Sequence, residues 1–109
     1  MTAESLPKAV NQFRKKNGKV WRAFTELGES CHQAGPLDEK TRRLVKLALS
    51  IGGGLEGATH SAVRNARKSG VSIDEMEHVA LLSITTLGLP AATRAWTWIA
   101  DGNRTGKQK

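Results

Sequence analysis

The spacing of apolar residues constrains the fold of this 109-residue chain more than any other feature. Between the glycine and proline signals, apolar side chains recur three or four residues apart, which is the period of an α-helix. The alternation of apolar and polar residues that marks a half-buried strand does not occur in the sequence. We therefore predict an all-α protein with about six helices in one domain.

Stop signals divide the chain into the six predicted helices. Most of these signals are glycines, alone or beside asparagine or proline. The predicted helices end near Lys16, before Gly35-Pro36, at Gly52–Gly54, before Gly70, near residue 87 and near residue 100. Asp38 is a suitable N-cap for the third of them.

Ser72 and Glu75 mark the clearest helix start in the chain. Their spacing is that of a capping box, and Val71 and Met76 can form the accompanying hydrophobic staple. The helix that follows, at about residues 73–87, is apolar on nearly all sides. We expect it to be buried within one protomer or between protomers.

Cys31 is the only cysteine. A single cysteine excludes an internal disulfide, a Cys-x-x-Cys redox pair and a cysteine-based zinc site. Cys31 continues an apolar stripe formed by Val20, Phe24 and Leu27 at helical spacing. We therefore expect Cys31 to be a small buried hydrophobic residue.

The sequence also argues against several classes of protein and of binding site. No apolar run reaches about 18 residues, so we predict no membrane span. The first ten residues lack the basic and then apolar order of a signal peptide, so a cytoplasmic location is expected. The histidines His32, His60 and His78 lack the close spacing of metal ligands, so the prediction is no metal and no cofactor.

The chain carries a net charge of +7, with many of its basic residues near the N-terminus. A basic chain can bind nucleic acid, but no recognised nucleic-acid motif is present and aromatic residues are few. We expect a solvated basic surface that attracts a small anionic substrate. Binding of anions or nucleic acid by residues 1–19 is kept as an alternative.

Glu56 and His60 are the candidate catalytic residues. They are four residues apart on a predicted helix, so both side chains lie on one face. A carboxylate can fix the tautomer of a neighbouring imidazole and favour its protonated form, which suits acid/base catalysis. In the alternative interpretation, Glu56 only complements the helix dipole and His60 is an ordinary, partly buried residue. The preceding Gly52–Gly54 run could hold an anion at free N–H groups or only form a tight turn.

Several short motifs follow one another in a characteristic order. They are Leu37-Asp38-x-x-Thr41-Arg42, Glu56-x-x-x-His60, Gly70, Ser72-x-x-Glu75 and Gly88-x-Pro90-Ala91-Ala92. Their order and spacing resemble the carboxymuconolactone decarboxylase family of the alkylhydroperoxidase-D-like superfamily. The resemblance covers about residues 36–102, which leaves an N-terminal helical segment at 1–35 and an expected disordered basic tail at 103–109.

This resemblance implies an alkylhydroperoxidase-D-like helical bundle that assembles as a homotrimer or homohexamer, with active sites near subunit contacts. The peroxidase branch of the superfamily uses a Cys-x-x-Cys pair and a histidine, with three residues between the second cysteine and the histidine. Gly53 and Glu56 occupy the matching cysteine positions here. Thiol peroxidase activity is therefore not expected.

The decarboxylase branch is closer, because it carries a glutamate four residues before the histidine, as Glu56 and His60 do here. In that branch, acid/base residues assist the loss of carbon dioxide from an anionic lactone. The resemblance thus implies a decarboxylase-like lyase, in which Arg42 or Arg43 could bind a substrate carboxylate. The chain has no tyrosine, so any tyrosine-dependent proton relay is absent. The alternative is a non-catalytic helical binding or assembly module that has lost the peroxidase thiols.

Trp98 is the expected oligomer contact. In the last predicted helix, Ala92, Ala95, Trp96 and Ile99 form the inward stripe, and Trp98 lies off it. A domain this small cannot easily hide the apolar residues between positions 76 and 99 within one protomer. We therefore predict a homo-oligomer with Trp98 at or near the contact.

Overall fold

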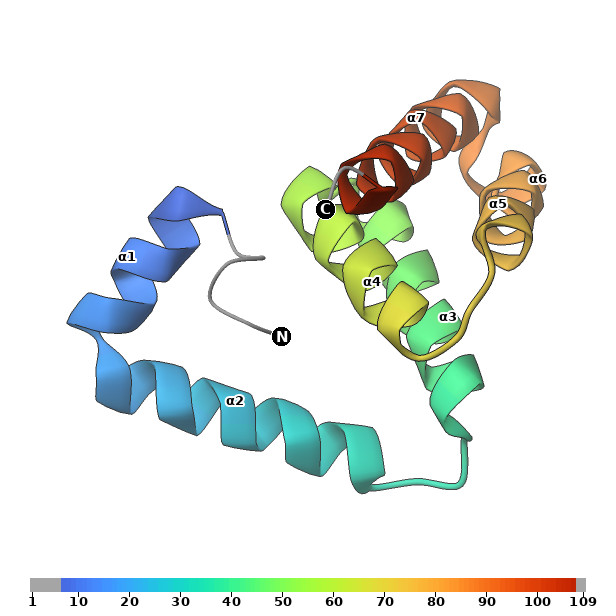
Figure 1. The fold of residues 1–109 in the computed structure, drawn as a ribbon. Helices are drawn as coiled ribbons and strands as arrows, with labels where there is room; N and C mark the ends of the chain where they lie inside the picture. The colour runs from blue at the N-terminus through green and yellow to red at the C-terminus, as the bar shows by residue number, and fades with distance from the viewer. Residues whose placement is uncertain (1–6, 108–109) are drawn as a thin grey trace. The chain divides into compact units, whose positions relative to one another are not determined.

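The computed structural model describes residues 7–107, with side chains as far as Asn103 (Figure 1). The chain divides into two compact units, Met1–Pro36 and Leu37–Lys109, and each is described by itself. The described residues are helical apart from turns and short connections, which confirms the all-α prediction. None of the described helices is both long enough and apolar enough to cross a membrane.

The first unit contains two amphipathic helices, α1 (Lys8–Lys16) and α2 (Gly18–Gln33), which meet at Asn17. Neither helix has a buried residue. Phe24 and Leu27 are 63% and 62% exposed, and Cys31 is exposed as well. The expectation that Cys31 is buried was therefore wrong, because the apolar stripe to which it belongs has no partner within the described unit.

The second unit contains five helices among the described residues: α3 (Glu39–Gly52), α4 (Glu56–Lys68), α5 (Ile73–Leu82), α6 (Ile84–Leu87) and α7 (Leu89–Lys107). Helices α3 and α4 form a hairpin, α4 also packs on α7, and α5 contacts both α3 and α7 (Figure 1). The core between them comprises Leu47, Ile51, Val63, Ala66, Val71, Met76, Ala80, Ala95 and Ile99.

Local capping explains where several of these helices begin and end. The Asp38 side chain accepts a hydrogen bond from the Thr41 N–H at 2.8 Å, and Ser72 and Glu75 form both hydrogen bonds of the capping box. Gly70, with φ of 84°, allows its own N–H and that of Val71 to reach carbonyl groups in the last turn of α4. These predicted caps are confirmed.

Two predicted helix boundaries in the C-terminal part were wrong. The helix expected at residues 73–87 is interrupted at Ser83, which separates α5 from α6, and Gly88 with φ of 98° ends α6. The last helix does not stop near residue 100 but extends to Lys107, so residues 103–107 of the expected disordered tail are helical. Residues 108–109 lie outside the described residues.

The burial of the two tryptophans of α7 is the reverse of what was expected. Trp98 is buried with 9% exposure, whereas Trp96 is 40% exposed. Trp98 lies one turn before Gly102, and a Cβ atom on Gly102 would lie 2.8 Å from Val63 of α4. Both residues thus belong to the side of α7 that meets α4, so the expectation that Trp98 lies off the inward stripe was wrong, and an oligomer contact at or near Trp98 stays a prediction.

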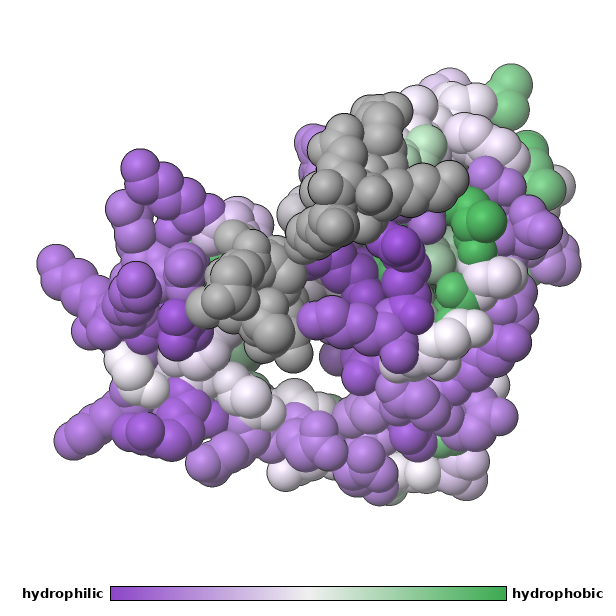
Figure 2. Space-filling view, in the orientation of Figure 1, coloured by the Kyte–Doolittle hydropathy of each residue, from purple (hydrophilic) through white to green (hydrophobic). Residues whose placement is uncertain are grey.

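Hydrophobic residues also remain on the surface of the second unit. Figure 2 shows them gathered over the end that carries α5, α6 and the start of α7. Leu82 and Leu89 are 62% and 59% exposed, and Leu49 of α3 is 69% exposed. The fifth predicted helix was expected to be buried within one protomer or between protomers. Within the protomer, α5 is buried only on its Met76 and Ala80 side, and burial of its other side between protomers stays a prediction.

Candidate functional site

The candidate site lies at the start of α4, directly after the turn that closes the α3–α4 hairpin. Gly54 adopts φ of 68°, a left-handed conformation that glycine takes without strain, and so lets the chain reverse within three residues. Leu55 is the N-cap residue of α4 and has no side chain that can cap it. The N–H groups of the first turn of α4 therefore receive no side-chain hydrogen bond from the N-cap residue.

Glu56 and His60 lie side by side on α4. Their Oε2 and Nε2 atoms are 4.0 Å apart, which is ion-pair distance but longer than a hydrogen bond. Nε2 is inaccessible and has no hydrogen-bond partner among the described residues. The His60 side chain is nevertheless 29% exposed, so the exposed part of its ring lies away from Nε2, and Glu56 is 60% exposed. The arrangement leaves a carboxylate and an imidazole edge open to solvent.

Arg42 and Arg43, the expected substrate-binding residues, lie at the other end of the hairpin. Arg42 donates to the Leu37 carbonyl group and to Glu39, and Arg43 donates to Glu39 at 2.9 Å and to Ser69 at 3.3 Å. Ser69 follows the last residue of α4, whereas Glu56 is the first. The 13 residues of α4 span about 20 Å, so within one protomer these arginines do not reach the Glu56–His60 pair.

Arg94 of α7 is the arginine that the structure brings to this end of α4. Its Nη2 atom lies 3.7 Å from the position that a Cβ atom on Gly54 would take. Its guanidinium carbon lies 5.2 Å from the centre of the Trp98 ring, a cation–π contact that holds the side chain in place. Among the described residues, no carboxylate forms an ion pair with Arg94. The sequence signal was the four-residue spacing of Arg94 and Trp98, but nothing in it pointed to α4.

Arg64 lies one turn beyond His60 on α4. Its Nε atom is inaccessible and has no hydrogen-bond partner among the described residues. Burial lowers the pKa of its guanidinium from the ordinary value, although an arginine remains charged at neutral pH. Arg64 therefore lies on the same helix as the Glu56–His60 pair, and Arg94 lies beside Gly54 in the turn that precedes this helix.

The described residues include no group of three or more histidine, cysteine, aspartate or glutamate side chains that could hold a metal ion. The pair formed by Glu56 and His60 supplies only two such side chains. What it offers chemically is proton exchange next to positive charge, which suits an anionic substrate.

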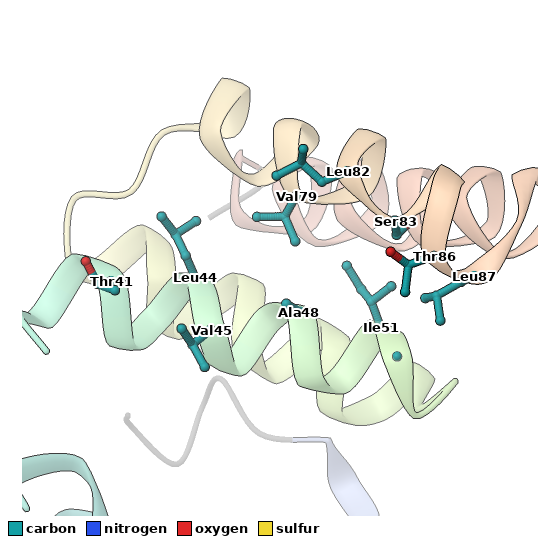
Figure 3. A pocket seen from close by; sticks show the side chains of 11 residues that line it. Thr41, Leu44, Val45, Ala48, Ile51, Val79, Leu82, Ser83, Thr86 and Leu87 are labelled. Atoms are coloured by element: carbon teal, nitrogen blue, oxygen red, sulfur yellow. The ribbon is translucent and has the colours of Figure 1, made fainter. Parts of the chain in front are cut away.

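An apolar groove of about 380 Å³ lies elsewhere on the second unit, between α3 on one side and α5 and α6 on the other (Figure 3). Its lining residues are Thr41, Leu44, Val45, Ala48, Ile51, Gly52, Val79, Leu82, Ser83, Thr86 and Leu87. Neither Glu56 nor His60 lines it. The groove therefore does not belong to the candidate catalytic pair.

Comparison with known proteins identifies the family. The model of the carboxymuconolactone decarboxylase family matches residues 19–101. The match begins within α2, so it extends further towards the N-terminus than the resemblance at 36–102 indicated. No curated protein and no solved structure matches the chain. A family match over most of its length shows that the chain belongs to the carboxymuconolactone decarboxylase family.

Proposed function

We propose that this protein is a small oligomeric acid/base enzyme, a decarboxylase-like lyase that acts on a carboxylate-bearing substrate through Glu56 and His60. The observation that carries the proposal is their placement: an exposed carboxylate 4.0 Å from an imidazole nitrogen that has no other partner among the described residues. Hydrogen bonds of catalytic residues are often long in free enzymes and shorten when substrate binds.

In the proposed reaction, the bond between the substrate carboxylate and the adjacent carbon breaks and carbon dioxide leaves. The electron pair stays on that carbon, where a conjugated carbonyl group of the substrate stabilises it. His60 then delivers a proton to the carbon, and Glu56 holds the imidazole in the required tautomer. No electrons are gained or lost overall, so the reaction requires no oxidant or reductant.

A cation would bind and orient the substrate carboxylate in the site. Within one protomer, Arg94 is the better candidate for this role, because it lies at the start of α4 and has no carboxylate partner among the described residues. Arg42 and Arg43 could serve the pair only from a neighbouring copy in a homotrimer or homohexamer. Assembly with sites near subunit contacts would also explain the exposed leucines of α3, α5 and α7.

The test is a screen of carboxylated lactones and β-keto acids for release of carbon dioxide by the wild-type protein. His60→Ala is expected to lower turnover at least about 100-fold, which is the lower range for loss of a general acid/base. His78→Ala, at an exposed histidine of α5, is the matched control and should retain turnover. If the wild type turns over none of these substrates, the proposal loses its main support.

A second candidate function is a non-catalytic helical assembly module. It is favoured by the apolar groove between α3, α5 and α6, which is separate from the catalytic pair and suits contact with another protein surface. The two candidate functions predict different effects of a substitution in the groove on turnover. Val45→Asp should disrupt assembly in either case, but only the enzyme would also lose turnover through a site completed by a neighbouring copy.

A further inference from the structure

The two nitrogens of the His60 ring lie in different surroundings. Nε2 lies 4.0 Å from Oε2 of Glu56, has no access to solvent and has no hydrogen-bond partner among the described residues. Nδ1 also forms no hydrogen bond with a described residue, but it is not closed off from solvent, and the side chain as a whole is 29% exposed. Glu56 and His60 both belong to α4, so their spacing is set within one helix.

The neighbouring carboxylate favours one tautomer of the neutral ring. A neutral imidazole has one N–H donor and one lone pair that accepts. With the proton on Nδ1, the lone pair of Nε2 would be cut off from water and would face the Glu56 carboxylate, which is also an acceptor. With the proton on Nε2, the N–H group lies beside a negative charge, and the lone pair of Nδ1 can accept a hydrogen bond from water. The geometry therefore favours the tautomer with the proton on Nε2.

We infer that His60 exchanges its proton with the substrate through Nδ1, while Nε2 keeps its proton beside Glu56. This inference rests on the proposed function and adds the atom that acts. Protonated His60 donates its Nδ1 proton to the carbon that carbon dioxide has left, and the ring becomes neutral with its remaining proton on Nε2. Water then returns a proton to Nδ1. Glu56 takes no proton in this sequence and acts through His60, so it is a positioning residue.

The use of Nδ1 narrows the class of substrate. Nδ1 is bonded to Cγ, the ring atom that leads back to the helix, whereas Nε2 lies at the far end of the ring. A proton donor must come within about 2.6–3.2 Å of the atom that receives the proton, so the receiving carbon must come close to α4. This requirement favours a small carboxylate-bearing substrate whose receiving carbon has no bulky substituent. Among β-keto acids, those with an unsubstituted carbon between the two carbonyl groups should therefore react faster than those with a dialkylated carbon.

Alkylation by bromoacetate tests the assignment without turnover. A ring nitrogen displaces the bromide only if it has a free lone pair and the reagent can reach it. The reaction is run under mildly alkaline conditions, in which imidazoles are neutral. The Cys31→Ser variant is used, so that the exposed thiol does not consume the reagent. The two carboxymethylhistidine isomers are then identified in the proteolytic peptide that contains His60. The expected product carries the carboxymethyl group on Nδ1.

His78 provides the control within the same chain. Its side chain is exposed on α5, and an imidazole with both nitrogens free reacts mainly at Nε2, the less hindered nitrogen. The two histidines should therefore give opposite isomers in one sample. Alkylation of His60 at Nε2 would overturn the inference, and so would a His60 that stays unmodified while His78 reacts. These products form without turnover, so failure of the inference and failure of the proposed function give different results.

Glu56→Ala tests whether the carboxylate sets the tautomer. Glu56 is 60% exposed, so its removal should leave the helix intact, which circular dichroism checks. Without the carboxylate, no charge favours the proton on Nε2, and His60 should give both isomers. Glu56→Gln keeps an acceptor oxygen and should retain Nδ1 as the main site. Glu77→Ala, which removes a carboxylate from α5, should give the wild-type ratio. A ratio of isomers that is the same in Glu56→Ala as in the wild type would overturn the positioning role of Glu56.

Discussion

Gly102 of α7 and Val63 of α4 meet so closely that no side-chain carbon fits between them. A Cβ atom on Gly102 would lie 2.8 Å from Cγ1 of Val63, a residue with no exposed surface. The packing of α7, which carries Arg94, against α4, which carries the Glu56–His60 pair, thus depends on this glycine where it meets Val63. It lies near the opposite end of α7 from Arg94.

Gly102→Ala should destabilise the second unit by about 1–3 kcal/mol, because α7 must move away from α4 to admit the methyl group. Urea unfolding followed by circular dichroism measures the change. Gly57→Ala is the matched control, since a Cβ atom there meets nothing within 4 Å. It should be neutral or stabilising by up to about 1 kcal/mol. Equal effects of the two substitutions would contradict this explanation.

Trp98→Ala should lower the free energy of unfolding by roughly 3–5 kcal/mol, as for other buried aromatic residues. Trp96→Ala, at a residue that is 40% exposed, should have a much smaller effect. The comparison is made by urea unfolding of both variants at the same protein concentration. The reverse order of effects would indicate that the burial of the two side chains is exchanged in solution.

Ser69→Ala should destabilise the protein by about 0.5–1.5 kcal/mol, the usual contribution of a hydrogen bond. The Ser69 hydroxyl donates to Glu39 at 2.6 Å and so ties the end of α4 to the start of α3. Ser50→Ala provides the comparison, because its hydroxyl donates only to Lys46 within the same helix and its loss should change little. A Ser69→Ala variant as stable as the wild type would mean that the hydrogen bond between Ser69 and Glu39 does not contribute to stability.

Acid should weaken the fold partly through Glu75. The Lys40 ammonium group and then the Ser72 N–H hold the pKa of the Glu75 carboxyl below its ordinary value of 4.5. Its contribution to stability is therefore fully present above about pH 4.5 and is lost as the pH falls through the lowered pKa. Glu75→Gln should lower stability at pH 7 and flatten its decline between pH 5 and pH 3. Glu77→Gln is the control on the same helix, and a decline identical to that of Glu75→Gln would contradict the assignment.

If Arg94 binds the substrate carboxylate, Arg94→Ala should raise KM by about 10- to 100-fold, which corresponds to one charge-assisted hydrogen bond. Arg94→Lys should restore part of the loss, because it keeps the charge without the planar fork. Arg67→Ala, near the far end of α4, should leave KM unchanged. The measurement requires a substrate from the screen. An unchanged KM in Arg94→Ala would exclude this role.

Sequence reasoning succeeded where a few neighbouring residues decide the structure. The Asp38 cap, the Ser72–Glu75 capping box and the Gly70 terminus each depend on contacts within one or two turns. It failed where a helix has more than one neighbour. Helix α7 packs on both α4 and α5, so its buried sector is wider than a single stripe and includes Trp98.

In the candidate site, too, local relationships could be predicted from the sequence and contacts between helices could not. The adjacency of Glu56 and His60 follows from their spacing on one helix and is confirmed, while their role stays a prediction. Arg42 and Arg43 were associated with the pair without any local rule, and the hairpin places them at its other end. Arg94 could not be found from the sequence, because only the packing of α7 on α4 brings it to Gly54.

The absence of buried side chains in α1 and α2 has a consequence for biosynthesis. A ribosome releases the first unit before any residue of the core, and residues 37–109 follow over about 4–15 s. During that interval the first unit has no buried side chain of its own, so its apolar residues stay exposed until the rest of the chain has been synthesised.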